Sequence, residues 1–161
     1  VSYILKSEPL KPEEQKMKTI DEIRMLDDAE QVNEIYNIFD EDSRLSSPAS
    51  RVEFLTTVRY ADQYLKPGMR ILDIGAGTGA YSLYYASRGY RVDALELSDR
   101  NLNVLRQKIT PEMNISCQKG NALDLSGYPD NCFDLVFLMG PLNTCIVKRT
   151  AEHVFPKPCG Y

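Results

Sequence analysis

Three glycines at alternate positions, Gly75, Gly77 and Gly79, directly follow a short apolar segment, residues 70–74, that contains Asp73. The β-branched isoleucines of that segment predict a buried parallel strand, and a helix is expected to begin near Gly79. Because glycine has no Cβ, the backbone there can turn sharply and lie against a ligand. The stretch therefore predicts the ligand-binding corner of an open α/β sheet.

Polar side chains also stand at the ends of two further expected strands. Glu96 directly follows the strand expected over residues 91–95, and Asn121 and Ala122 follow the next one. Open α/β sheets bind their ligands at the carboxyl ends of their strands. The Glu96 carboxylate could accept hydrogen bonds from both hydroxyls of a ribose. A side-chain oxygen of Asn121 and a backbone N–H near it could contact the edge of an adenine.

The glycine loop alone leaves two kinds of cofactor open. Gly75, Gly77 and Ala80 satisfy the loose G-x-G-x-x-G/A pattern of dinucleotide-binding folds. An acidic residue about 20 positions further on is expected for either cofactor. A nicotinamide-dependent oxidoreductase is therefore an alternative at this point.

The rest of the pattern predicts the elements that position these residues. Thr19 and Glu22 fit a capping box, and the apolar spacing that follows predicts one kinked helix or two short ones, with a break near residue 27. Ser47-Pro48 opens another helix. Further expected elements are helices over residues 80–88 and 98–109 and strands over residues 114–118 and 133–139. Strands that alternate with helices predict an α/β fold with a parallel sheet.

Four segments, taken in order, resemble the class I S-adenosylmethionine-dependent methyltransferases, particularly the bacterial methyltransferase-domain group. The segments are residues 71–79, 92–98, 120–125 and 132–136. The resemblance implies a Rossmann-like open parallel sheet of order 3-2-1-4 with N-terminal helices. It divides the chain into an N-terminal helical extension (1–47), an S-adenosylmethionine-binding domain (48–143) and an irregular C-terminal tail (144–161).

The resemblance also implies roles for single residues. Gly75 and Gly77 would let the backbone approach the methionine part of the cofactor, whose amino group Asp73 would help to orient. Glu96 would hold the ribose hydroxyls, and Asn121, where many relatives carry Asp, would contact adenine. The full cofactor-binding set is Asp73, Gly75, Ala76, Gly77, Gly79, Glu96, Leu97, Asn121, Ala122, Met139 and Gly140. Tyr36, Arg51 and Tyr81 are further side chains that could reach the cofactor. No metal site is expected.

The implied activity is methyl transfer to an unidentified acceptor, with S-adenosylhomocysteine as product. No catalytic base is evident, and Asn143 is the residue we expect to face the acceptor. Family members continue with further strands, so the chain is expected to be truncated after its fourth strand. A non-catalytic S-adenosylmethionine-binding module is therefore an alternative. The uncovered edge of strand four predicts a homodimer through that edge or through the tail.

The composition of the chain bears on its expected partners and its expected location in the cell. A chain of 161 residues with a net charge of −4 and a pI near 5.1 predicts one domain that is not a dedicated nucleic-acid binder. A small molecule or a protein is therefore favoured over RNA as acceptor. No apolar run approaches the roughly 20 residues of a membrane span. Without a signal-peptide core or a Cys-x-x-Cys pair, the expected location is cytoplasmic, with reduced cysteines.

Overall fold

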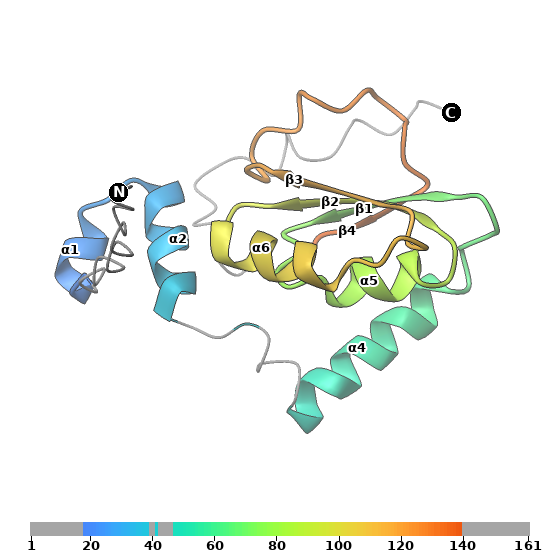
Figure 1. Ribbon diagram of the computed structural model, residues 1–161, viewed down its shortest axis with the longest axis horizontal. Helices are drawn as coiled ribbons and strands as arrows, with labels where there is room; N and C mark the ends of the chain where they lie inside the picture. The colour runs from blue at the N-terminus through green and yellow to red at the C-terminus, as the bar shows by residue number, and fades with distance from the viewer. Residues whose placement is uncertain (1–17, 39–40, 42–46, 140–161) are drawn as a thin grey trace, which may run out of the picture.

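An open parallel sheet forms the centre of this computed structural model, which describes residues 18–38, 41 and 47–139 (Figure 1). Its order is β3-β2-β1-β4, and every pair of neighbouring strands is parallel. The strands are β1 (Arg70–Ile74), β2 (Arg91–Glu96), β3 (Ile115–Lys119) and β4 (Leu135–Phe137). The predicted fold class and the predicted strand order are both confirmed.

The helices are α1 (Ile20–Arg24), α2 (Asp28–Ile38), α4 (Pro48–Ala61), α5 (Ala80–Ala86) and α6 (Asp99–Lys108). Of these, α1, α4 and α6 begin where the capping residues predict. Thr19 and Glu22 form the reciprocal capping box, and the side chains of Ser47 and Ser98 accept from the first turns of α4 and α6. Of the two arrangements expected near residue 27, the two-helix one is correct.

Helices α5 and α6 cover one face of the sheet, and the connection between β3 and β4 covers the other (Figure 1). On the helical side, Val58 and Ala61 of α4 pack with the fully buried Tyr85 of α5 and with Phe137 of β4. On the opposite side, Leu72, Ile74 and Leu95 pack against residues of the connection, among them Ala122, Leu125, Tyr128 and Phe133. The sheet is thus covered on both faces, as parallel sheets require.

The last strand is shorter than its apolar run. Residues 133–139 were predicted to form it, but only Leu135–Phe137 pair with β1. The Asp134 N–H donates to the Arg70 carbonyl at 2.9 Å, and the Asp134 carboxylate accepts the Arg70 N–H at 2.7 Å, so the two chains are joined there outside the regular ladder. The third strand also begins one residue later than predicted. Gly140, Asn143 and the tail 144–161 lie outside the described residues.

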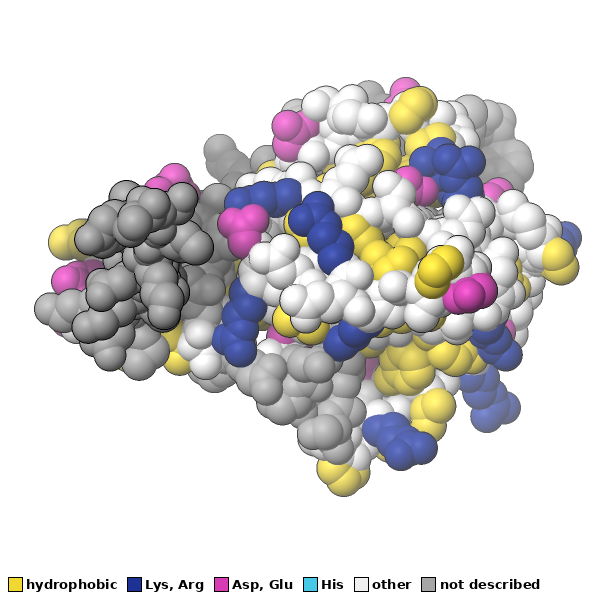
Figure 2. All heavy atoms as spheres, viewed as in Figure 1, with side chains coloured by type: hydrophobic (Ala, Val, Ile, Leu, Met, Phe, Trp, Pro, Cys, Tyr) yellow, Lys and Arg dark blue, Asp and Glu magenta, His cyan; other side chains and the backbone are white. Residues whose placement is uncertain are grey.

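The described surface bears on the expected partners. On the face drawn in Figure 2, Lys and Arg side chains are separated by acidic and uncharged ones and do not form a continuous stripe. Within residues 18–38, 41 and 47–139, no helix combines the length and the apolar character that crossing a bilayer requires. Cys117 and Cys132 are free thiols, as predicted, whereas Cys145 and Cys159 lie outside the described part.

Candidate functional site

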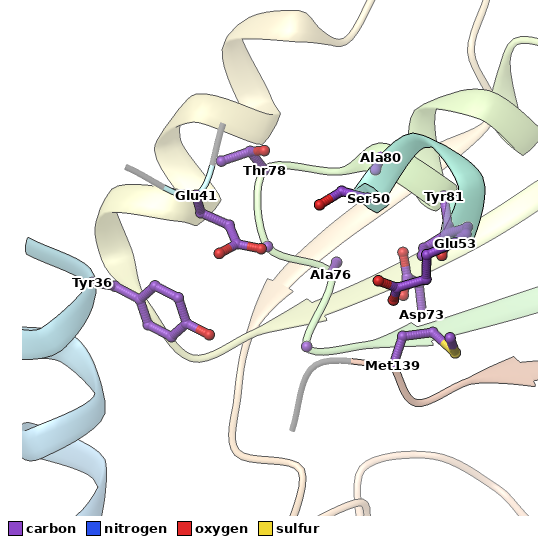
Figure 3. Close-up of a pocket in the computed structure, with 12 residues that line it drawn as sticks. Tyr36, Glu41, Ser50, Glu53, Asp73, Ala76, Thr78, Ala80, Tyr81 and Met139 are labelled. Atoms are coloured by element: carbon purple, nitrogen blue, oxygen red, sulfur yellow. The ribbon is translucent and has the colours of Figure 1, made fainter. Parts of the chain in front are cut away.

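A pocket lies over the glycine turn between β1 and α5 (Figure 3). Four parts of the chain contribute to its walls: the turn with the adjoining ends of β1 and α5, the first turns of α4, Tyr36 of α2 together with Glu41, and Met139 after β4. The lining residues are Tyr36, Glu41, Ser50, Glu53, Asp73, Gly75, Ala76, Gly77, Thr78, Ala80, Tyr81 and Met139. The pocket therefore lies at the carboxyl end of β1, where open α/β sheets bind ligands.

The pocket has two ends with the glycine turn between them (Figure 3). Glu53, Asp73 and Met139 lie at one end, whereas Tyr36 and Glu41 lie at the other. Carboxylates are therefore present at both ends. A ligand that lies along the turn meets bare backbone in the middle and negative charge on either side.

Five of the predicted cofactor-binding residues line this pocket: Asp73, Gly75, Ala76, Gly77 and Met139. Tyr36 and Tyr81, which were considered as side chains that could reach the cofactor, line it as well. Arg51 does not line the pocket and is exposed. The sequence-based set is thus divided between residues at the pocket and residues behind it.

Glu96 is one of the residues behind the pocket. Its carboxylate accepts the Gly77 N–H at 2.7 Å with one oxygen and the Ser98 N–H at 2.7 Å with the other. The side chain is buried, with only 4% of its surface exposed. In this structure Glu96 therefore holds the glycine turn against the end of β2. The turn is fixed further by the Gly75 and Ala76 N–H groups, which both donate to the Leu95 carbonyl.

The other predicted residues support the turn or pack away from it. Gly79 is the N-cap of α5, with a left-handed φ of 92°. The Asn121 side-chain oxygen accepts the Leu123 N–H at 3.0 Å, and Ala122 packs on the core beneath the sheet. Neither these residues nor Leu97 are among those that line the pocket. Their roles toward a ligand stay predictions.

Asp73 is the buried charge of the site. Burial raises the pKa of its carboxyl from 3.8 to about 6, and the nearby Glu96 charge acts in the same direction. The Ser82 hydroxyl, which donates to Asp73 Oδ2 at 2.6 Å, partly offsets this effect. Asp73 is thus poised to titrate just below neutral pH, and a positive ligand in the pocket would favour its charged form.

Burial also raises the pKa of Glu96, against which the backbone N–H groups of Ser98 and Gly77 act. Two carboxyl groups with raised pKa values thus lie beside one turn, Asp73 at the pocket and Glu96 behind it. Such perturbed groups at a pocket are typical of functional sites.

An aromatic stack fixes the wall formed by α4 and α5. The Tyr81 ring is stacked between Phe54 and Phe137, with centroid distances of 5.1 Å on each side. Tyr81 is therefore packed against two aromatic side chains at the wall of the pocket. Because Phe54 belongs to this stack, the neighbouring Glu53 and the preceding turn of α4 are held at the pocket.

The sequence motifs did not predict four of the pocket residues, which are Glu41, Ser50, Glu53 and Thr78. Ser50 and Glu53 are three positions apart and thus share one face of α4. That spacing is visible in the sequence as a small polar face beside the apolar stripe. It does not reveal where the helix packs, so the signal is too weak to predict a site.

Replacing Glu96 by alanine is expected to lower the free energy of unfolding by about 1–3 kcal/mol, because two buried backbone N–H groups lose a charged acceptor. The amides of Gly77 and Ser98 should also exchange with solvent faster. Urea unfolding and amide hydrogen exchange measure the two effects.

Asp124→Ala is the matched control, since Asp124 likewise accepts a backbone N–H, from Ser126, but at an exposed turn. It should leave stability nearly unchanged. Unaltered exchange at Gly77 in Glu96→Ala would show that this carboxylate does not hold the turn.

The sheet order, the glycine turn and the carboxylates at the strand ends define an open α/β domain, a class of fold that binds ligands at the carboxyl ends of its strands. Residues 72–154, which are more than half of the chain, match the family model described as "Methyltransferase domain". The chain therefore belongs to the methyltransferase domain family. The resemblance to class I S-adenosylmethionine-dependent methyltransferases is confirmed.

Individual relatives align with this chain over only part of their own length. A demethylmenaquinone methyltransferase from Tropheryma whipplei (strain Twist) is 35% identical over 72 residues, covering 45% of this chain and 29% of that protein. Phosphoethanolamine N-methyltransferase 3 from Arabidopsis thaliana is 28% identical over 107 residues, covering 64% and 20%. The chain thus spans less than a third of either curated relative.

Among solved structures, the PH0226 protein from Pyrococcus horikoshii OT3 superposes with a TM-score of 0.53 and 26% identity. The match covers 64% of this chain and 49% of that one. It supports the fold assignment over the sheet and its helices.

Proposed function

We propose that this chain binds S-adenosylmethionine in the pocket over the glycine turn and that it is the cofactor-binding part of a methyltransferase. The observation that carries the proposal is the combination of bare turn backbone with three carboxylates at one pocket, in a chain that belongs to the methyltransferase domain family. Residues 48–143 form the cofactor-binding unit, and the N-terminal extension contributes Tyr36 and Glu41.

The residues at the pocket fit this cofactor by charge. S-Adenosylmethionine carries a positive sulfonium, a positive amino group and one carboxylate, so its net charge is positive. Asp73 and Glu53, at one end of the pocket, are suited to hold the two positive groups. Gly77 lies against the ligand without a side chain, and Glu96 stabilises the turn from behind. The family resemblance adds Asn121 and Ala122 as the contacts to adenine.

When bound, the cofactor supplies a methyl carbon that its positively charged sulfur already activates. The chain's own contribution is binding and alignment. Tyr81 and Met139 form an apolar wall beside the carboxylates, and the aromatic stack keeps that wall in place. A rigid wall holds a bound group in one orientation and keeps water from its apolar side.

The charge of the pocket argues against a dinucleotide. The pyrophosphate of NAD carries two negative charges, which dinucleotide-binding folds place at the glycine turn. Here Glu41, Glu53 and Asp73 surround that turn and would repel a pyrophosphate. We therefore favour S-adenosylmethionine over a nicotinamide cofactor as the ligand of this pocket.

We propose a small molecule as methyl acceptor. Two relatives, a demethylmenaquinone methyltransferase and a phosphoethanolamine N-methyltransferase, are named after acceptors of this kind. β4 is an edge strand among the described residues, with Val136 half exposed, and we propose that a second copy pairs there. Light scattering at tens of micromolar checks the dimer, and a monomeric mass would exclude it.

Calorimetric titration tests the cofactor. We expect saturable binding of S-adenosylmethionine and S-adenosylhomocysteine to one site, and none of NAD under the same conditions. Binding of NAD alone would overturn the proposal. Transfer of a labelled methyl group to a panel of quinol, phosphoamine and thioester-bound acceptors then tests catalysis. Binding without transfer to any acceptor would favour the non-catalytic binding module.

A further inference from the structure

Negative charge is distributed unevenly around the pocket. Three of its twelve lining residues, Glu41, Glu53 and Asp73, carry carboxylates, and none of the described lining residues is Lys or Arg. Two of the three, Glu53 and Asp73, lie at the end that also holds Met139 (Figure 3). This end is therefore built for a positively charged group beside an apolar surface.

The two carboxylates at this end differ in what holds them. Asp73 is buried in the sheet and accepts the Ser82 hydroxyl, so its charge is tied to the packing of α5. Glu53 projects from α4 and is exposed. A change at Glu53 thus alters the charge of the pocket without removing a buried hydrogen bond.

The backbone of α4 gives Glu53 a fixed place. Its neighbour Phe54 stacks on Tyr81 at 5.1 Å and meets Tyr84 edge to face at 5.4 Å. One turn further along α4, Val58 is buried in the core. Because these contacts anchor the helix, the Glu53 carboxylate needs little ordering of the backbone to act on a ligand in the pocket.

We propose that Glu53 is a specificity-determining residue that makes the pocket prefer the sulfonium cofactor over its neutral thioether product, an inference that rests on the proposed function. The two molecules differ by one methyl group and one positive charge. Both molecules carry the amino group, which we assign to Asp73. A carboxylate at Glu53 that faces the sulfur attracts the sulfonium charge and gains little from the uncharged thioether sulfur. Such a preference would favour release of the product after transfer.

The test compares dissociation constants of wild type and Glu53→Gln for three ligands: S-adenosylmethionine, S-adenosylhomocysteine, and sinefungin, in which an amine-bearing carbon replaces the sulfonium. We expect Glu53→Gln to weaken binding of the two cationic ligands about three- to fivefold, the size of an ion pair that water still reaches. Binding of the thioether should stay within twofold. Comparing the ratio of thioether to sulfonium dissociation constants between wild type and Glu53→Gln cancels the contribution of the methyl group, which is the same in both proteins.

Three further measurements sharpen the result. Glu53→Asp keeps the charge and should keep the preference, whereas added salt should reduce the preference in wild type more than in Glu53→Gln. Glu30→Gln, an exposed glutamate on α2 that does not line the pocket, should change no dissociation constant. Thermal unfolding checks that each variant is folded.

If Glu53→Gln loses the same affinity for all three ligands, or loses none for any of them, the role of Glu53 is overturned. The proposed function would still stand. Failure of wild type to bind any of the three ligands would overturn both. If Glu53→Gln still prefers the cationic ligands as strongly as wild type does, other residues of the pocket cause the preference. That result would likewise overturn the role of Glu53.

Discussion

Replacing Gly79 by alanine is expected to lower the free energy of unfolding by about 2–5 kcal/mol. Of this, about 1–2 kcal/mol is the penalty for a left-handed backbone and about 1–3 kcal/mol is the cost of overpacking. Gly79 has φ +92°, and a Cβ there would overlap the Leu105 side chain and lie 3.2 Å from Leu83 Cγ. Leu105 is fully buried, so it has no room to move aside. Urea unfolding measures the loss.

Gly89→Ala separates the two causes. Gly89 has nearly the same φ, +86°, but a Cβ at this position would meet nothing within 4 Å. Gly89→Ala should therefore lower the free energy of unfolding only by the left-handed backbone penalty, about 1–2 kcal/mol. Equal losses in the two variants would mean that the contact between α5 and α6 at Gly79 is not tight, contrary to the structure.

Replacing Asp73 by asparagine is expected to stabilise the protein at neutral pH by up to about 3 kcal/mol, the free-energy equivalent of a pKa change from 3.8 to about 6. A raised pKa means that the folded state binds the proton more tightly than the unfolded state. Wild type therefore loses stability as the pH rises from about 4 to 6, and the cost is constant above that range. Asparagine carries no charge to bury, and its oxygen can still accept the Ser82 hydroxyl.

The measurement is the unfolding free energy of both proteins from pH 4 to pH 8. The two curves should nearly meet at pH 4 and separate as the pH approaches 6. Parallel curves would show that Asp73 does not titrate in this range. The same variant should bind S-adenosylmethionine more weakly, because the pocket loses a carboxylate while the fold gains stability. Such an opposition between stability and binding is common at functional sites.

The sequence predicted the centre of the molecule well because its signals are local. A buried run, a glycine turn and a helix start follow one another within residues 70–80, and each depends on near neighbours. Capping at Thr19, Ser47 and Ser98 was confirmed for the same reason, since a cap is a contact across three residues. The predicted start of β4 was wrong because the Asp134 carboxylate binds the Arg70 N–H where regular pairing would begin, a contact that periodicity does not record.

Within the candidate site, the sequence by itself determined the turn, Asp73 and the presence of Glu96 at the end of β2. Only the tertiary structure decided that Glu53 and Glu41 join the pocket and that the Glu96 carboxylate binds backbone N–H groups beneath the turn. The physical reason is distance along the chain. Glu53 reaches the pocket because Phe54 and Val58 pack on α5, and Glu96 turns inward because Gly77 and Ser98 offer it two donors. Both outcomes depend on packing between segments far apart in the sequence, which no local pattern encodes.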